Sequence, residues 1–225
     1  MREILGRRRR TRSALLDAAL TCAERWHWPV LPGAGMRTRP SCLGLRRDRD
    51  GSCACLLPEC VVPGAHPEDP GLLAATSDPR MVRWWWTNRP DAPIVLATGT
   101  SVSAVSLPAV SGRRALRLFD LLGVRVGPVT ATTTRLTLLV APYSMEELGE
   151  LLHEHDWVPS SLRYHGRGGY VVLPPSEVGA GRVRWERPPP EVPGGGAPWL
   201  PTVTAVVDAL VEASRLAPDG TRLAY

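Results

Sequence analysis

The feature that most constrains the fold is a group of cysteine and histidine residues inside a long stretch without helix or strand periodicity. This stretch runs from Gly33 to about Pro70 and is rich in arginine, glycine, proline and cysteine. Irregular segments of this length are uncommon in compact domains unless something holds them together. The sequence therefore predicts that the loop is ordered by a device other than a hydrophobic core.

Four residues of this loop have the chemistry and spacing of a metal site: Cys53, Cys55, Cys60 and His66. Zn²⁺ is bound by four thiolate or imidazole ligands in a tetrahedron, and close cysteine pairs on turns supply such ligands. Metal binding can order a segment that has no core of its own. We therefore predict a structural zinc ion as the cofactor, with Cys42 as the alternative to His66 for the fourth ligand.

Disulfides and scattered free thiols are the other interpretations of the cysteines. Disulfides are typical of secreted proteins, but the basic N-terminus leads into an amphipathic segment, Thr11 to Trp26, and not into an apolar signal core. Free cysteines are mostly buried singly and are not clustered around turns. No apolar run approaches the ~20 residues of a transmembrane helix. We expect a cytoplasmic protein that does not enter a membrane.

Apolar periodicity predicts a mixture of helices and short strands, and hence an α+β fold. Two helix starts carry cap signals, Asp78-Pro79 and the capping box Ser144 to Glu147. The turn from His165 to Gly168 is expected to join the last two strands of the sheet. Helices are expected at residues 13–26, 79–89, 111–122, 144–155 and 203–216, and strands at 28–32, 93–98, 102–107, 128–133, 136–140, 161–164 and 169–173.

Three segments are expected along the chain. Residues 1–12 form a basic arm, residues 13–187 form the folded domain, and residues 188–225 form a linker followed by a last amphipathic helix. The linker is predicted from Pro188-Pro-Pro190 and Gly194-Gly-Gly196, because runs of proline and glycine are typical of such segments.

The net charge of +5 lies in the arm, because residues 1–12 hold six arginines and one glutamate while the other residues balance. A domain that binds nucleic acid through many phosphates usually carries a basic excess in its body. Nucleic-acid contact is therefore predicted at Arg7, Arg8, Arg9 and Arg10. The alternative is a solvated tail, which is the common role of short charge runs.

A series of short motifs follows in one order. It comprises Pro63-Gly64-Ala65-His66-Pro67, Ala75-Thr76-Ser77-Asp78-Pro79, Trp84-Trp85, Arg89-Pro90-Asp91-Ala92-Pro93, Ala97-Thr98-Gly99 and the glycine-rich segment from Gly166 to Ser176. The series resembles the N-terminal domain of bifunctional DNA primase–polymerases, in the archaeo-eukaryotic primase superfamily. Linked motifs in one order are more specific than any of them alone. The resemblance implies the primase fold, with an RNA-recognition-motif-like sheet module, a second α/β module and a zinc-binding loop.

The resemblance also implies metal-dependent nucleotide transfer, which can be checked residue by residue. The family uses an Asp-x-Asp strand, a histidine and a third carboxylate. Two carboxylates at i and i+2 face one side of a strand and can hold two divalent ions. Here Ser106 and Pro108 stand in place of the aspartates, Leu136 in place of the histidine and Arg163 in place of the third carboxylate. These replacements predict a catalytically inactive domain, a pseudo-enzyme.

Three functions remain open. The first is an inactive nucleic-acid-binding or regulatory module, whose partner is single-stranded DNA or a replication or regulatory protein. The Arg163 guanidinium could then bind phosphate without a metal, or pair with a nearby carboxylate. The second is an active enzyme with displaced metal ligands. The third is a protein-interaction domain with no nucleic-acid role, in which Trp84-Trp85-Trp86 packs as core or forms the contact of a homodimer; base stacking is the other role for these tryptophans.

Overall fold

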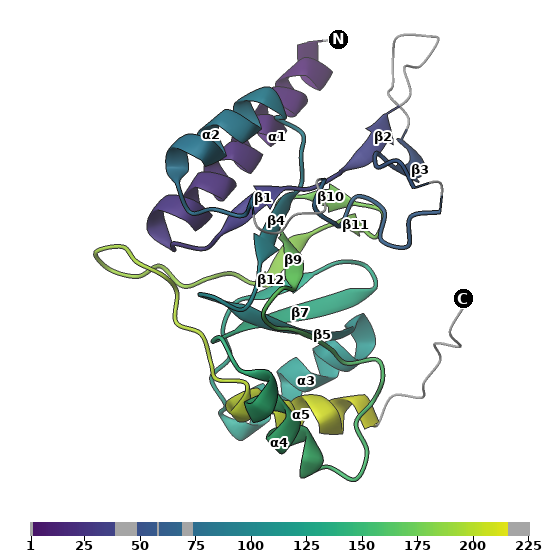
Figure 1. Cartoon of the computed structure of the whole chain (residues 1–225), viewed down its shortest axis with the longest axis vertical. Coiled ribbons are helices and arrows are strands. Elements are labelled where there is room, and N and C mark those ends of the chain that lie inside the picture. The colour runs from purple at the N-terminus through teal and green to yellow at the C-terminus, as the bar shows by residue number, and fades with distance from the viewer. Residues whose placement is uncertain (1, 39–48, 58, 69–73, 216–225) are drawn as a thin grey trace. The chain divides into compact units, whose positions relative to one another are not determined.

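The computed structural model describes residues 2–38, 49–57, 59–68 and 74–215, and the side chains of residues 11–37, 52–57, 59–68 and 74–214 (Figure 1). Within these ranges the chain forms helices and short strands, which confirms the α+β class. It divides into two compact units. Unit 1 comprises Met1–Ala97 and Tyr170–Arg184, and unit 2 comprises Thr98–Gly169 and Trp185–Tyr225.

Unit 1 is built on a three-stranded antiparallel sheet and two helices. The strands lie in the order β1 (Val30–Pro32), β4 (Ile94–Ala97) and β9 (Tyr170–Leu173). Their apolar and β-branched residues suit a buried sheet, and every residue of β1 is buried. Helix α1 (Arg2–Leu20) continues into a π-helical turn, η1 (Thr21–Arg25), and packs beside α2 (Pro79–Asn88) (Figure 1).

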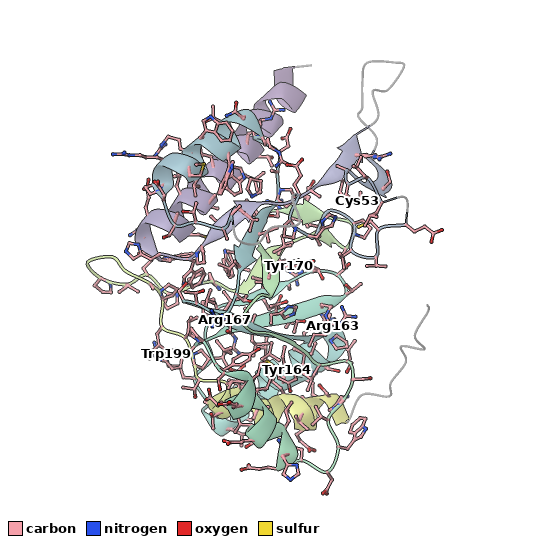
Figure 2. All side chains as sticks on the ribbon, viewed as in Figure 1. Cys53, Arg163, Tyr164, Arg167, Tyr170 and Trp199 are labelled. Atoms are coloured by element: carbon pink, nitrogen blue, oxygen red, sulfur yellow. The ribbon has the colours of Figure 1, made fainter. Side chains whose placement is uncertain are left out.

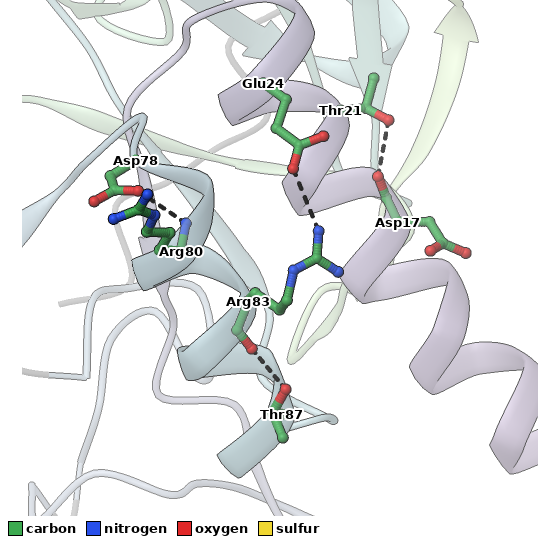
Figure 3. A network of polar contacts seen from close by, with 7 residues as sticks. All are labelled: Asp17, Thr21, Glu24, Asp78, Arg80, Arg83 and Thr87. Carbon is green, nitrogen blue, oxygen red and sulfur yellow. Dashed lines mark hydrogen bonds and ion pairs between the residues drawn. The ribbon is translucent and has the colours of Figure 1, made fainter.

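Polar contacts explain where α2 begins and how it meets η1 (Figure 3). The carboxylate of Asp78 accepts a hydrogen bond from the backbone N–H of Arg80 at 2.8 Å, so Asp78 is the N-cap of the helix. The helix start predicted from Asp78-Pro79 is confirmed. Arg83 donates to Glu24 of η1 at 3.4 Å. Three residues further along α2, Trp86 is 1% exposed and its indole N–H donates to the carbonyl of Ala92.

The stretch from Gly33 to Pro70, predicted to be irregular, contains an antiparallel pair of short strands. These are β2 (Met36–Thr38) and β3 (Arg49–Cys53), and a second short pair in unit 1 joins β10 (Glu177–Val178) to β11 (Gly181–Arg182). Strands this short and this rich in arginine and glycine have no apolar alternation, so the sequence pattern does not reveal them. The pair matters for the site because Cys53 is the last residue of β3.

Unit 2 carries a five-stranded sheet with helices packed on one face (Figure 1). The strands lie in the order β12 (Arg184–Arg187), β6 (Val129–Ala131), β7 (Arg135–Val140), β5 (Ser103–Pro108) and β8 (Arg163–His165). The helices are α3 (Ala109–Leu122), α4 (Met145–His153) and α5 (Thr204–Arg215). One core joins alternate strand residues such as Val105, Leu107, Leu136 and Leu138 to apolar residues of these helices.

The turn from His165 to Gly168 joins β8 to β9, but these strands lie in different sheets, contrary to the prediction that they close one sheet. Strand β8 pairs with β5, and β9 pairs with β4 in the other sheet. The reason is a second loop that lies against this segment: the Thr98 side chain donates to the carbonyl of Gly166 at 2.7 Å. The two loops approach so closely that a Cβ on Gly99 would lie 2.2 Å from the Cα of Arg167. Each strand therefore pairs beyond this contact and not with its neighbour in sequence.

Candidate functional site

A cysteine and histidine cluster lies in unit 1, at the end of β3 (Figure 2). One ligand atom from each of Cys53, Cys55, Cys60 and His66 lies within 4.8 Å of all the others. Sulfur atoms around a tetrahedral metal ion are roughly 3.8 Å apart, given metal–sulfur bonds of ~2.3 Å. The four residues are thus close enough to share one centre and could hold a metal ion.

The backbone around the cluster brings its two ends together. The carbonyl of His66 accepts from the N–H of Ala34 at 2.9 Å, and Gly33 forms a β-bridge with Pro67, so the histidine segment is tied to the chain after β1. Gly64 has a φ of +71°, and a Cβ there would lie 2.9 Å from the sulfur of Met36. Only glycine fits this turn without strain.

Hydrogen bonds around Cys53 favour its thiolate. Burial acts to raise the pKa of Cys53, but bonds from the backbone of Cys55 and Gly64 and from the side chains of Cys55 and His66 outweigh it and lower the pKa to about 6. The N–H of Gly64 donates to the Cys53 sulfur at 3.1 Å. Thiolates are the form in which cysteine binds metals.

His66 is oriented for ligation by its other ring nitrogen. Its Nδ1 lies 2.6 Å from the carbonyl oxygen of Pro67, and its Nε2 lies 3.2 Å from the sulfur of Cys53. When Nδ1 carries the proton and donates it to this carbonyl, Nε2 has a lone pair for a metal ion in place of its contact with the Cys53 sulfur, which is the usual arrangement of a metal-bound histidine. Cys42, the alternative fourth ligand, lies outside the described residues.

A second group of polar side chains lies on the sheet of unit 2, on the face opposite to Val105 and Leu107. Ser106 of β5 is directly opposite Arg163 of β8 in the strand register, so the two side chains share this face. Arg135 of β7 donates through Nη2 to the carbonyl of Ser106 at 2.8 Å, to its hydroxyl at 3.1 Å and to the carbonyl of Ser161 at 2.9 Å. The Ser106 hydroxyl is also 2.9 Å from Nε2 of His165.

The positions compared with the primase family fall on both sides of this sheet. Ser106 and Arg163 lie on the polar face, and Pro108 is opposite Arg135 at the end of β5. Leu136, which the resemblance places at the family histidine, is 0% exposed in the hydrophobic core. Its neighbour Arg135 lies on the polar face, and its side chain reaches Ser106, although the direct partner of Ser106 in the register is Thr137. Arg135 and His165 were not predicted as site residues from the sequence, because their place beside Ser106 depends on the register of β7 and β8 with β5.

Burial and like charge both act on Arg135. Burial, and then the positive charge of Arg163, lower the pKa of Arg135 to about 10. Strands β5, β6, β7 and β8 contain no aspartate or glutamate; the sheet's one carboxylate, Glu186, is on β12 at the far edge. Within the described ranges neither Arg135 nor Arg163 forms an ion pair. The polar face is therefore cationic.

The remaining predicted contacts lie in unit 1. Arg7, Arg8, Arg9 and Arg10 fall within α1, and their side chains are outside the described set. Of the three tryptophans of α2, Trp86 is buried, Trp85 is half-buried and Trp84 is 61% exposed. Trp84 lines a shallow groove together with Glu24, Pro79, Arg80, Arg83 and Thr87. The core interpretation is thus correct for Trp86, while Trp84 is on the surface.

None of the helices in the described part of the chain is both long and apolar enough to cross a membrane.

The sequence matches a known protein family. Residues 19–195 match the family described as bifunctional DNA primase/polymerase, N-terminal, which is more than half of the chain. No curated protein and no solved structure matches the chain. On the strength of the family match, this chain belongs to the bifunctional DNA primase/polymerase N-terminal domain family.

Proposed function

We propose that this chain is a catalytically inactive primase/polymerase-like domain that acts as a nucleic-acid-binding or regulatory module. The observation that carries the proposal is the polar face of the unit 2 sheet. Ser106, Pro108 and Arg163 stand where the resemblance puts the carboxylates of active members, and the register sets Ser106 beside Arg163. A serine, a proline and an arginine are not ligands for Mg²⁺ or Mn²⁺, which prefer carboxylate oxygens.

The chemistry of nucleotide transfer explains why these replacements support inactivity. Attack on the α-phosphate of a nucleotide requires metal ions that neutralise the triphosphate and activate the attacking hydroxyl. The cationic pair Arg135 and Arg163 would repel a divalent ion at this place, because like charges a few ångströms apart oppose each other even when partly screened. The face can attract phosphate but has no means of placing metals beside it.

An active enzyme with displaced ligands would need a carboxylate cluster elsewhere. Among the described residues the one group of three or more convergent His, Cys, Asp or Glu side chains is the cluster at Cys53. The acidic pair Glu154 and Asp156 lies at the end of α4 and outside the sheet. This distribution supports the inactive alternative.

We assign the metal of the Cys53 cluster as structural zinc. Three thiolates and one imidazole form a closed tetrahedral set, which suits Zn²⁺ and leaves no position for a reacting water. The cluster joins the last residue of β3 to His66 further along the loop, so zinc would fix a segment in which Leu56, Leu57 and Val61 are exposed.

A second function is supported by the surface of α2. Met81 is 44% exposed and Trp84 is 61% exposed beside the groove on the same helix. Exposed aromatic residues of this kind are enriched at protein interfaces. A homodimer or a protein partner would cover them, and a Trp84→Ala change that lowers the mass of the particle in solution would favour this function.

The test of the primary proposal is nucleotide incorporation. Purified protein is incubated with labelled nucleotides and Mg²⁺ or Mn²⁺ on primed and unprimed single strands, beside an active member of the family as a positive control. We expect no product. Product that increases with protein concentration and persists in Arg163→Ala would show that metal ligands lie elsewhere and that the domain is an enzyme.

A further inference from the structure

The polar face of the unit 2 sheet holds two arginines around one serine. Ser106 lies between them: Arg163 is its direct partner on β8, and Arg135 binds it from β7. Arg163 is exposed, Arg135 is half-buried and Ser106 is 3% exposed. The face thus has an outer guanidinium in contact with solvent and an inner guanidinium fixed behind it.

Among the described residues, only neutral groups bind the inner guanidinium. Its Nη2 donates to the two carbonyls of Ser106 and Ser161 and to the Ser106 hydroxyl, and none of these acceptors carries a charge. Its Nε is buried and has no hydrogen-bond partner among the described residues. A buried guanidinium without a carboxylate is unusual, because such charges are normally paired. The positive charge of Arg135 is therefore oriented but not neutralised.

The outer guanidinium has no carboxylate partner among the described residues either. Arg163 lies on the edge strand β8 and forms no ion pair there, and its neighbour β5 and the next strand β7 contain no carboxylate. Folding therefore places two like charges together, which is unfavourable unless an anion joins them. Guanidinium groups bind phosphate oxygens through paired N–H donors, and such bonds need no metal.

We propose that Arg163 binds a phosphate group on this face, with the fixed charge of Arg135 behind it, in the absence of any divalent metal. This inference rests on the proposed function: it names phosphate as the ligand of the polar face, which the inactive domain has in place of a metal site. The phosphate can belong to a free nucleoside triphosphate or to a strand of single-stranded DNA, and both sources are tested.

The experiment measures the affinity of the full chain for a labelled oligonucleotide and, separately, for a nucleoside triphosphate. The buffer contains no added divalent metal, and it contains no chelator, which would also strip the Cys53 cluster. Arg163→Glu is the test variant. Arg117→Glu is the matched control, because it makes the same change in charge at an exposed arginine of α3, the helix on the other face of the sheet.

We expect Arg163→Glu to lower the affinity for at least one of the two ligands by about tenfold or more. Arg117→Glu should change the affinity for either ligand by less than about twofold. Arg135→Gln, which keeps an N–H donor for Ser106 but removes the charge, should weaken the same ligand by several-fold. Addition of Mg²⁺ should not strengthen binding. Which ligand responds identifies the source of the phosphate.

Equal losses in Arg163→Glu and Arg117→Glu, or binding that appears only with Mg²⁺, would overturn the inference. Single-stranded DNA could bind the Arg163→Glu variant with full affinity but fail to bind a variant without the arm arginines. That result would refute this site and leave the proposed function standing. Binding of neither ligand to the unchanged protein would refute both. Thermal unfolding of each variant shows that losses do not come from misfolding.

Discussion

Ser106 on β5 lies directly opposite Arg163 on β8, and the guanidinium of Arg135 on β7 reaches the same serine. Burial and the charge of Arg163 lower the pKa of Arg135 to about 10. Within the part of the chain that the structure describes, neither cation has an ion-pair partner. Surfaces that carry such a cost are commonly those kept for binding, because stability and function compete there. The relationship leads to a prediction about stability as well as one about ligands.

Arg163→Glu should make the protein more stable by about 0.5–1 kcal/mol, because the new carboxylate would face Arg135 in place of a like charge at an exposed position. The free energy of unfolding in urea, at neutral pH and low salt, measures the change. Arg163→Ala should give a smaller gain. A variant that loses both stability and phosphate binding would indicate that Arg163 has a structural role.

Metal analysis should find one equivalent of zinc in the purified protein, and Cys55→Ser or His66→Ala should lower it. The reason is that the four ligand atoms at Cys53 lie within 4.8 Å of one another, so each contributes to one centre. Cys42→Ser is the matched comparison. If Cys42→Ser loses zinc while His66→Ala retains it, then Cys42 and not His66 is the fourth ligand.

Thiol reactivity separates the cluster from the remaining described cysteine. Burial raises the pKa of Cys22 to about 12, and the side chain is 2% exposed, so it should not react with alkylating reagents in the folded protein. Cys55 and Cys60 are half-buried and should react once the metal is removed. Mass spectrometry after alkylation checks both. Rapid modification of Cys22 under native conditions would contradict the packing of α1 and η1.

Replacing Arg7, Arg8, Arg9 and Arg10 with alanine should weaken binding to single-stranded DNA, because the arm holds the net charge of +5. The slope of log affinity against log salt should flatten by up to about 3 for four phosphate contacts on a single strand. Alanine keeps the helix and leaves the ion pair between Arg12 and Asp91 intact. Unchanged affinity for single-stranded DNA would indicate that the DNA contacts the unit 2 sheet and not the arm.

Leu210→Ala should lower the free energy of unfolding by about 2–5 kcal/mol, because this leucine of α5 is 0% exposed in the core of unit 2. The position lies beyond residue 195, where the family match ends. Thr204→Ala, at an exposed position of the same helix, should change stability by less than about 0.5 kcal/mol. Similar effects of both changes would mean that α5 does not contribute to the core.

Features with local causes were predictable from the sequence. The starts of α2 and α4 follow from side-chain caps, and both caps are present: Asp78 accepts from Arg80, and the Ser144 hydroxyl accepts from the N–H of Glu147 at 3.0 Å. The grouping of Cys53 with His66 also follows from sequence spacing, because a single loop carries all four residues.

The antiparallel pair β6 and β7 was predicted from the sequence as a hairpin, but strand partners far apart in the chain could not be predicted, because they depend on contacts between distant residues. The segment from His165 to Gly168 has the composition of a hairpin turn, yet the side chain of Thr98, 68 residues before Gly166, donates a hydrogen bond to it. Arg135 was missed for a related reason. Its partner Ser106 lies on another strand, and only the register of β5 and β7 shows that Arg135, and not Leu136, shares its face.

The division of the chain also bears on how the protein is made. The chain leaves the ribosome from its N-terminus onward. Each unit is made of two segments, and residues of the other unit lie between them in the sequence. Strand β4 is synthesised more than seventy residues before β9, so the edge of β4 that pairs with β9 stays unpaired until β9 has been made. Unpaired edges of apolar strands are prone to intermolecular pairing. Slow synthesis between Ala97 and Tyr170 would therefore lengthen the period in which nascent chains can aggregate.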